Sequence, residues 1–300
     1  MKMLSRKLKG LTISIIFEAE STNYGEGIGN VTTLKKISRG TGESYSYLSR
    51  QAIRHDIIHQ MGLDNTPLVD AEVIQFADET SIKDYPEIDY FGYFKTSFKT
   101  ITRSAVVRLS NAVSLESFNA DIDFLTNKGL LDRYNETHDV KKDGGSIAQS
   151  EIHKSYYAYT ITIDLDLIGI DKDVEISNEE KAKRVKEFLD VVKFLYRDIK
   201  GRRENLSPLF VIGGVYDIKN PVFENRLNVK NNMLIVETIE SVLNLDERIQ
   251  ENTSCGLIKG KFNNDKEIES KLKSVGVGKF FNNLKTKVDE YYTDNKQVKR

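Results

Sequence analysis

Residues 11–19 read LTISIIFEA, and this stretch decides the fold. Apolar and polar side chains alternate along it, which is the two-residue period of a half-buried strand. A polar, glycine-punctuated loop over residues 21–42 leads into 47-YLSRQAIR-54, where we expect a helix over residues 47–61 that ends at Gly62. A strand, a long loop and a cationic helix start together predict a site for the phosphate backbone of an extended polymer.

Two more strands and one more helix are expected in the second half of the chain. The clearest alternation, over residues 157–167, predicts a central or near-central strand. A helix is expected to begin at Ser177, the first residue of a capping box, and apolar residues at helical spacing continue it to Gly201. Residues 209–212 read as a buried strand, and the two glycines that follow indicate a bulge or a close backbone approach.

The order strand, helix, strand, helix, strand predicts an α+β fold, a modified ferredoxin-like or RRM-like sheet backed by helices. We expect a single domain over residues 1–300 that carries large insertions. One is an acidic insertion at residues 62–94. The other covers residues 119–154, is polar and charged, and is expected to form a projecting β-hairpin.

The composition limits the class of protein. The chain has 300 residues, of which 39% are hydrophobic, enough to bury a core. No apolar run approaches the roughly 20 residues that span a bilayer, and residues 1–10 lack the apolar region of a secretion signal. We therefore expect a cytoplasmic protein without membrane contact. Cys255 is the one cysteine, and the four histidines give no zinc spacing, so neither a metal nor a cofactor is expected.

The formal net charge is −1, but acidic and basic residues are concentrated in separate segments of the chain. Residues 61–92 contain eight acids and one lysine, whereas residues 95–110 carry four cations and no acid. We hypothesise that the acidic segment, residues 64–89, contacts a basic face of a neighbouring copy.

Three cationic groups are candidates for binding a polyanion. Arg50 and Arg54 lie one helical turn apart beside Ser49 and Gln51, although an exposed amphipathic helix explains them equally well. Aromatic residues at positions 91–98 interleave with cations, a pattern that suits base stacking but also a strand with its aromatics inward. The third group flanks Gly201 and could instead stabilise a helix C-terminus. The cations of the last two groups are Lys95, Lys99, Arg103, Lys200, Arg202 and Arg203.

Several other motifs can be explained by ordinary structural roles. Asp164 and Asp166 resemble a metal-binding pair, yet their alternation with apolar residues also explains them as the polar face of a strand. His55 and His59 are four residues apart and could bind metal or act in RNA cleavage, but ordinary helical histidines are the favoured interpretation. The glycine-rich segment GEGIGN, residues 25–30, lacks the lysine of a phosphate-binding loop, so nucleotide hydrolysis is not supported.

The segments GLTIS (residues 10–14), FEAESTNYGEGIGN (residues 17–30) and YLSRQAIR (residues 47–54) resemble a known family. They are similar to the backbone subunit of the type I-B CRISPR surveillance complex, Cascade, in the DevR branch of the Cas-seven family of the RAMP superfamily. The resemblance implies an RRM-like palm that polymerises along a CRISPR RNA and presents this guide for pairing with target DNA in antiviral defence. A hairpin thumb that kinks the guide and flips one base at regular intervals is also implied, at residues 119–154.

The resemblance also implies which residues bind the guide and which partners take part. Backbone contacts are expected without base reading, because pairing reads the sequence. The partners would be CRISPR RNA, target DNA through the guide, further copies of the chain and other Cascade subunits. The expected RNA-binding residues are Ser49, Arg50, Gln51, Arg54, Lys99, Arg103, Lys141, Lys142, Arg202 and Arg203.

Catalysis is the main alternative. Related subunits of type III complexes cut RNA with an aspartate after the first strand, whereas residues 19–48 contain none, which favours a non-catalytic scaffold. Glu20, Glu26 and Glu43 keep that question open. The rival hypothesis is a RAMP-type endoribonuclease that processes CRISPR RNA with His55 or His59 in acid–base roles. A third possibility, suggested by the DevR name, is transcriptional regulation.

Overall fold

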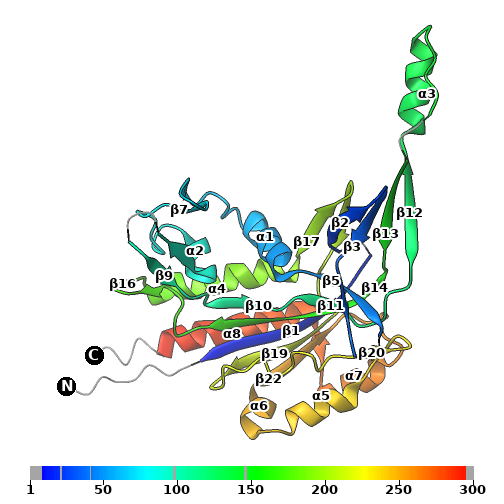
Figure 1. The fold of residues 1–300 in the computed structure, drawn as a ribbon. Coiled ribbons are helices and arrows are strands. Elements are labelled where there is room, and N and C mark those ends of the chain that lie inside the picture. Colours follow the sequence, from blue (N-terminus) through cyan, green and yellow to red (C-terminus); the bar gives the residue numbers. More distant parts are fainter. Residues whose placement is uncertain (1–8, 21, 41, 97–98, 145–146, 295–300) are drawn as a thin grey trace.

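The structure is a computed structural model that describes residues 9–20, 22–40, 42–96, 99–144 and 147–294. It shows a mixed α+β fold with one large sheet (Figure 1). Positions 21, 98 and 145, which belong to segments singled out in the sequence, lie outside the described residues. No helix of the described residues is long and apolar enough to span a membrane.

The main sheet is nine-stranded within the described part of the chain. Its three long strands, β1, β14 and β19, are antiparallel neighbours with β1 in the middle. The strands run in the order β23 (Val275–Gly276), β22 (Thr253–Leu257), β19 (Phe210–Tyr216), β1 (Gly10–Ala19), β14 (Ser155–Asp164), β11 (Ala112–Ser114), β5 (Ser44–Leu48) and β4 (Lys36–Ser38), and β10 (Val107–Leu109) also pairs with β14.

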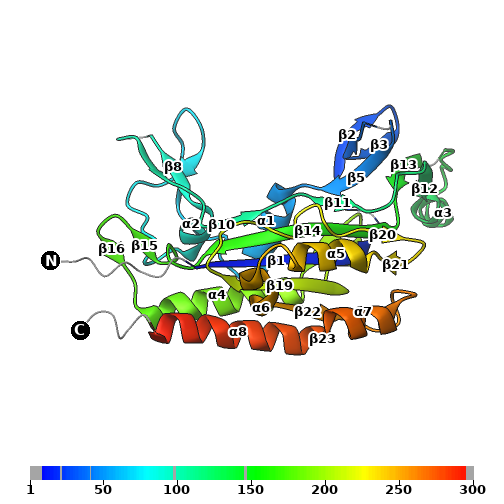
Figure 2. The same cartoon turned by 90° about the horizontal axis from the view of Figure 1, so that it is seen from below.

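Helices cover both faces of this sheet. On one face, Ile13 and its apolar neighbours in β1 pack in a core cluster with residues of α1, α4 and α8. On the other, Ile16 packs with residues of α5, α6 and α7. Figure 2 shows α4 and α8 running side by side along the sheet. The helices are α1 (Arg50–Gln60), α2 (Pro86–Phe91), α3 (Lys128–Thr137), α4 (Asn178–Lys193), α5 (Val236–Leu243), α6 (Glu247–Asn252), α7 (Asp265–Leu272) and α8 (Val277–Asp294).

The second helix layer corrects the expectation of a half-buried first strand. Thr12 and Ser14 are both 1% exposed because α5–α7 cover the face to which they point. The buried hydroxyls of Ser14 and Thr160 satisfy each other at 2.6 Å across β1 and β14. Alternation therefore located the strand correctly but did not reveal its covered second face.

The glycine pair after residue 212 lies inside β19 rather than after it. A Cβ atom on Gly213 would stand 2.0 Å from the carbonyl oxygen of Thr12, and one on Gly214 would stand 2.0 Å from that of Asn252. Gly213 also has φ +151°. The close backbone approach expected from the sequence is thus present on both sides of the strand.

Residues 22–40, expected as a loop, form strands. The first two belong to a four-stranded sheet in which β3 pairs in parallel with β13, through Gln149 opposite Val31, and the third is β4 of the main sheet. The sheet order is β12 (Asp121–Thr126), β13 (Ile147–Ile152), β3 (Val31–Leu34) and β2 (Tyr24–Ile28). Strands β12 and β13 form an antiparallel pair that leaves the body and carries α3 at its far end, a helix that the sequence analysis did not predict (Figure 1).

Two helix boundaries differ from the sequence analysis. Helix α1 begins at Arg50, not at residue 47, because β5 continues through Leu48 and Ser49 is the N-cap. Helix α4 begins after Ser177 as expected but ends at Lys193. The following residues turn into a hairpin, and Lys200 and Gly201 at its turn both have positive φ. The hairpin strands are β17 (Tyr196–Ile199) and β18 (Arg202–Asn205).

The acidic insertion contains α2 and the first of two short strand pairs, and the second pair begins at its end and continues beyond it. The strands are β6 (Leu68–Val69), β7 (Gln75–Phe76), β8 (Tyr93–Lys95) and β9 (Ile101–Arg103). Two further small pairs complete the described fold, namely β15 (Ile170–Asp171) with β16 (Val174–Glu175) and β20 (Val229–Lys230) with β21 (Met233–Leu234).

Candidate nucleic-acid interface

The start of α1 is fixed by three hydrogen bonds. The Ser49 hydroxyl oxygen accepts hydrogen bonds from Asn23 Nδ2 (2.9 Å) and from the backbone N–H of Ala52 (3.3 Å). The backbone N–H of Arg50 donates to Asn111 Oδ1 (2.9 Å). Ser49 is buried, so its role in the structure is to cap the helix. The exposed side chains of Arg50 and Gln51 are thereby presented from a fixed helix end.

Two adjoining cavities lie beside this helix start. One, of about 430 Å³, is lined by Arg50, Gln51, Arg54 and Arg108 together with Phe91 and other residues. The second, of about 520 Å³, shares Arg50 and Arg108 and adds Lys219. We call the two cavities, with their cations Arg50, Arg54, Arg108 and Lys219, the cationic groove. Its positive lining suits the phosphates of a nucleic acid.

Most cations of the groove already hold a carboxylate. Arg54 pairs with Glu87 at 3.3 Å and lies over the ring of Phe91. Arg108 pairs with Asp164 at 2.7 Å, and Lys219 lies 2.5 Å from Asp166 and 3.5 Å from Asp164. In the part of the chain that the structure describes, no ion pair involves Arg50. Its guanidinium is therefore the group most available to an incoming phosphate.

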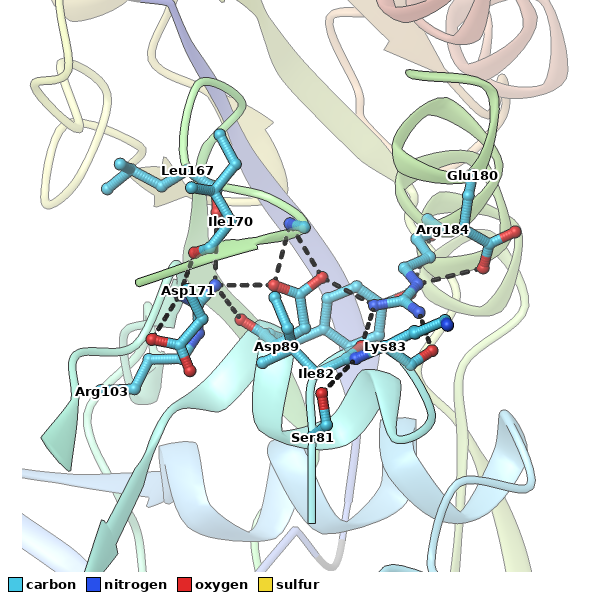
Figure 3. A network of polar contacts seen from close by, with 12 residues as sticks. Ser81, Ile82, Lys83, Asp89, Arg103, Leu167, Ile170, Asp171, Glu180 and Arg184 are labelled. Carbon is cyan, nitrogen blue, oxygen red and sulfur yellow. Dashed lines mark hydrogen bonds and ion pairs between the residues drawn. The ribbon is translucent and has the colours of Figure 1, made fainter. Parts of the chain in front are cut away.

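Arg103 was expected to line this groove, and the structure corrects that expectation (Figure 3). Its side chain is 7% exposed and donates to Asp89 Oδ1 at 2.6 Å. Asp89 is fully buried and also accepts hydrogen bonds from Arg184 (3.0 Å) and from the backbone N–H of Gly169 (2.9 Å). A charged network of this kind joins the acidic insertion to α4 and to the loop after β14. Arg103 is a structural residue in this arrangement.

The other predicted cations lie at separate places. Lys99 is exposed between β8 and β9, whereas Lys95 is 2% exposed and donates to the carbonyl oxygen of Thr80. Lys141 and Lys142 are exposed and belong to the segment between α3 and β13; Figure 1 shows α3 at the far end of the projection, away from α1. The structure therefore does not bring these lysines together with Arg50.

Arg202 and Arg203 lie on the β17–β18 hairpin and not in a turn after a helix. Arg202 bonds to Glu20 at 2.7 Å and to Glu204, and these carboxylates raise its pKa. Arg203 forms a two-point contact with Asp198. The hairpin contacts the four-stranded sheet through Lys200, whose ammonium lies over the ring of Tyr24. The side chains of both arginines are accessible to solvent. To bind RNA, however, each must exchange its carboxylate partner for a phosphate.

Arg108, Lys219 and Asn111 were missed as site residues by the sequence analysis. Arg108 did carry a signal, since it belongs to the acid-free cationic segment 95–110. Lys219 follows β19 and reaches the groove only through the fold, so its neighbourhood in the sequence gives no sign of it.

The alternative sites find little support among the described residues. His55 and His59 stack with ring centroids 6.2 Å apart on the exposed side of α1, and neither lines the groove. Asp164 and Asp166 face cations, as described above. No three histidine, cysteine or acidic side chains gather into a metal site in the described ranges.

The projecting β12–β13 pair is joined to the main sheet by a buried polar cluster. His153 Nδ1 lies 2.7 Å from the Ser46 hydroxyl, which also lies 2.6 Å from the Tyr157 hydroxyl. The imidazole packs edge-on against Phe118, at the opposite root of the projection. Burial lowers the pKa of His153, while the nearby carboxylates of Glu116 and Asp121 act in the other direction.

Low pH is expected to weaken the polar cluster that joins the β12–β13 pair to the main sheet. The pKa of His153 is lower in the folded protein than its unfolded value of about 6.5, so the unfolded chain takes up the proton first as pH falls. The contribution of neutral His153 to stability is complete above about pH 6.5 and is lost below it. Urea denaturation between about pH 7.5 and pH 5 should show a smaller loss of stability for His153→Gln than for the wild type. Equal losses would remove His153 from this role.

Comparison with known proteins places the chain in a family. Residues 11–233 match the family described as the CRISPR-associated negative auto-regulator DevR/Csa2. A search of curated proteins gives no match. A solved chain titled "CRISPR RNA-guided surveillance complex" is similar with a TM-score of 0.54 and 15% identity, over 85% of this chain and 91% of that one.

A second solved chain, titled "CRISPR RNA-guided surveillance complex, pre-nicking", has a TM-score of 0.59 and 11% identity over 92% of this chain and 100% of its own. At these identities the likeness is one of fold. The family match covers well over half of the sequence and includes both β1 and the cationic start of α1. The chain is a member of the CRISPR-associated DevR/Csa2 family.

Proposed function

We propose that this protein is a non-catalytic backbone subunit of a type I-B CRISPR surveillance complex. In this role it binds CRISPR RNA, assembles with further copies along the guide and presents the guide for pairing with target DNA. The cationic groove at the start of α1 is the observation that carries the proposal, because it sets four cations along two adjoining cavities. Family membership and the similarity to chains of RNA-guided complexes support it.

The shape of the molecule fits the assignment of parts. The large sheet with its helices would be the RRM-like palm, and residues 119–154, with the β12–β13 pair and α3, would be the thumb (Figure 1). Lys141 and Lys142 lie near the far end of that projection, where they would meet the guide away from the groove. In the acidic insertion, Glu87 and Asp89 form ion pairs with Arg54 and Arg103 of the same chain. The hypothesis of contact with a neighbouring copy therefore concerns the other acidic residues of the insertion.

A direct binding experiment tests the proposal. The purified chain should bind a CRISPR RNA and a version with a shuffled guide with similar affinity, because backbone contacts do not read bases. Its affinity should fall steeply with salt. The RNA should remain intact. Cleavage of the repeat hairpin that persists with a chelator and is lost in His55→Ala would favour the endoribonuclease instead.

The internal carboxylates of the groove are expected to restrain RNA binding. Asp164 neutralises Arg108 and lies near Lys219, so RNA phosphates must displace it. Asp164→Asn keeps the shape and removes the charge. We expect affinity for RNA to rise about three- to tenfold at low salt and the salt dependence to become steeper by about one counterion.

Asp289 offers a matched control, since it pairs with Lys186 between α8 and α4, outside the groove. Asp289→Asn should change affinity less than Asp164→Asn does. An unchanged affinity and salt dependence for Asp164→Asn would mean that Arg108 does not meet the phosphates.

A further inference from the structure

A short hairpin lies between the start of α1 and the projecting β12–β13 pair, as Figure 1 and Figure 2 both show. It consists of β2 and β3, residues 24–34, and we call it the β2–β3 hairpin. It contains the glycine-rich segment 25–30, which does not line the cationic groove. The residue directly before the hairpin contacts the helix start, and the strands of the hairpin contact the projection.

Asn23 connects the β2–β3 hairpin to the start of α1. Its side-chain amide donates to the Ser49 hydroxyl oxygen at 2.9 Å, and both residues are only 7% exposed. Its carbonyl oxygen accepts a hydrogen bond from the backbone N–H of Lys35 at 2.9 Å, which ties its backbone to the end of β3. Ser49 is the N-cap directly before Arg50. A displacement of Asn23 therefore alters the helix end that presents Arg50 to the cationic groove.

The β2–β3 hairpin also holds the projecting pair. The Tyr24 hydroxyl donates to the carbonyl oxygen of Glu151 in β13 at 3.1 Å. The Glu151 carboxylate accepts hydrogen bonds from the backbone N–H of Leu34 and from Lys36 Nζ, both at 2.8 Å. In the sheet order β13 lies between β12 and β3, so β3 supplies its lateral contact with the rest of the described fold.

Beyond its root, the projecting pair is exposed. All six residues of β12 are exposed, and α3 at its far end has no buried residue. Segments with few buried apolar contacts and exposed backbone hydrogen bonds open locally at a small cost in free energy. We therefore expect two states of the projection, one with β13 paired to β3 and one with β13 detached from it.

We propose that the β2–β3 hairpin couples RNA binding in the cationic groove to the placement of the β12–β13 pair, with Asn23 and Tyr24 as positioning residues. The two are adjacent in the backbone, so a displacement of this segment alters both the helix cap and the contact with β13. RNA phosphates at Arg50 favour the intact cap and hence the state in which β13 is paired. By linkage, pairing of β13 favours RNA binding to the same extent. The inference rests on the proposed function, since it takes the groove as the RNA site.

Hydrogen–deuterium exchange of the full chain, free and saturated with CRISPR RNA, tests this coupling. In the wild type, RNA should slow backbone exchange in residues 147–152 by at least about fivefold. In Asn23→Ala, at an RNA concentration that again saturates the protein, the slowing should be less than about twofold. RNA that touched the projection directly would slow exchange equally in both proteins. That result, or no slowing in the wild type, would overturn the proposal.

Asn178→Ala is the matched control for Asn23→Ala. The side-chain amide of Asn178 donates to the carbonyl oxygen of Tyr292 at 3.0 Å, so this variant also loses one amide hydrogen bond. The contact joins α4 to α8 and involves neither the β2–β3 hairpin nor the groove. RNA should therefore slow exchange in residues 147–152 of Asn178→Ala as much as in the wild type.

Tyr24→Phe tests the coupling from the other side and covers the case in which Asn23→Ala fails to fold. It removes the hydroxyl that reaches Glu151, and exchange in residues 147–152 without RNA should become about threefold to fivefold faster. Exchange in residues 50–54, at the helix start, should also rise. Tyr45→Phe removes a hydroxyl that donates to Glu43 at 2.7 Å, and it should leave both segments unchanged. A change in Tyr24→Phe that is confined to residues 147–152 would contradict the coupling.

RNA binding separates this proposal from the one on which it rests. If the wild type binds CRISPR RNA without slower exchange in residues 147–152, the coupling is wrong and the groove stands as the RNA site. If it binds no RNA, both proposals fail. Slowing that persists in Asn23→Ala but is lost in His153→Gln would place the link in the polar cluster at Ser46 and would contradict the role of Asn23.

Discussion

Replacing Asp89 by alanine is expected to lower the free energy of unfolding by about 3–5 kcal/mol. The carboxylate is fully buried and receives hydrogen bonds from Arg103, Arg184 and Gly169. Without it, two guanidinium groups, 7% and 3% exposed, would keep their charges in the protein interior without a shared counterion. Urea denaturation of the two proteins measures the difference.

Two further variants make this experiment specific. Asp89→Asn keeps the shape of the side chain and some of its hydrogen bonds, so it should lose less stability than alanine. Asp64→Ala lies in the same acidic insertion, but Asp64 is exposed and pairs with His59 at the surface, so little change is expected. If Asp89→Ala were as stable as Asp64→Ala, the network in Figure 3 would not hold the insertion in place.

Reversing the charge of Arg50 should give the largest loss of RNA binding. Arg50 lines both parts of the cationic groove and, among the described residues, forms no ion pair of its own. Arg50→Glu replaces attraction by repulsion, and we expect affinity to fall by about 30- to 150-fold at low salt, or about 2–3 kcal/mol. The salt dependence should become shallower by at least about one counterion.

The control for Arg50→Glu is Lys279→Glu, which makes the same change in net charge on an exposed residue of α8. It should leave RNA affinity nearly unchanged. Fluorescence anisotropy with two unrelated guide sequences should show the same fold-change for Arg50→Glu with each. A defect confined to one guide sequence would contradict a backbone contact.

The long strands and the presence of α1, though not its first residue, could be predicted from sequence because local patterns determine them. β14 has the clearest alternation of the chain, and Ser49 precedes the helix as a good N-cap. Strands β2 and β3 were missed, since both are short, β2 contains glycines, and β3 gains part of its pairing from β13, more than one hundred residues away. The end of α4 was missed for a similar reason, because apolar spacing continues through Leu195 into β17.

The site was predictable only where its residues are close in the sequence. Arg50, Gln51 and Arg54 share one helix start, and the structure places them on one cavity. Arg103 looked like a free cation because its partner Asp89 lies on α2, fourteen residues earlier, in a segment read only as acidic. The cations Arg108 and Lys219 meet through the pairing of β10, β14 and β1 with β19, which no local pattern reveals.

The most direct measurement is the identity of the RNA that the protein carries. We would produce the chain together with a CRISPR array and the neighbouring genes, purify it through a high-salt wash and sequence the bound RNA. The account predicts full-length CRISPR RNAs in a large particle with several copies of the chain, and loss of that RNA in Arg50→Glu. A monomer without RNA, or one that cuts the repeat, would contradict it.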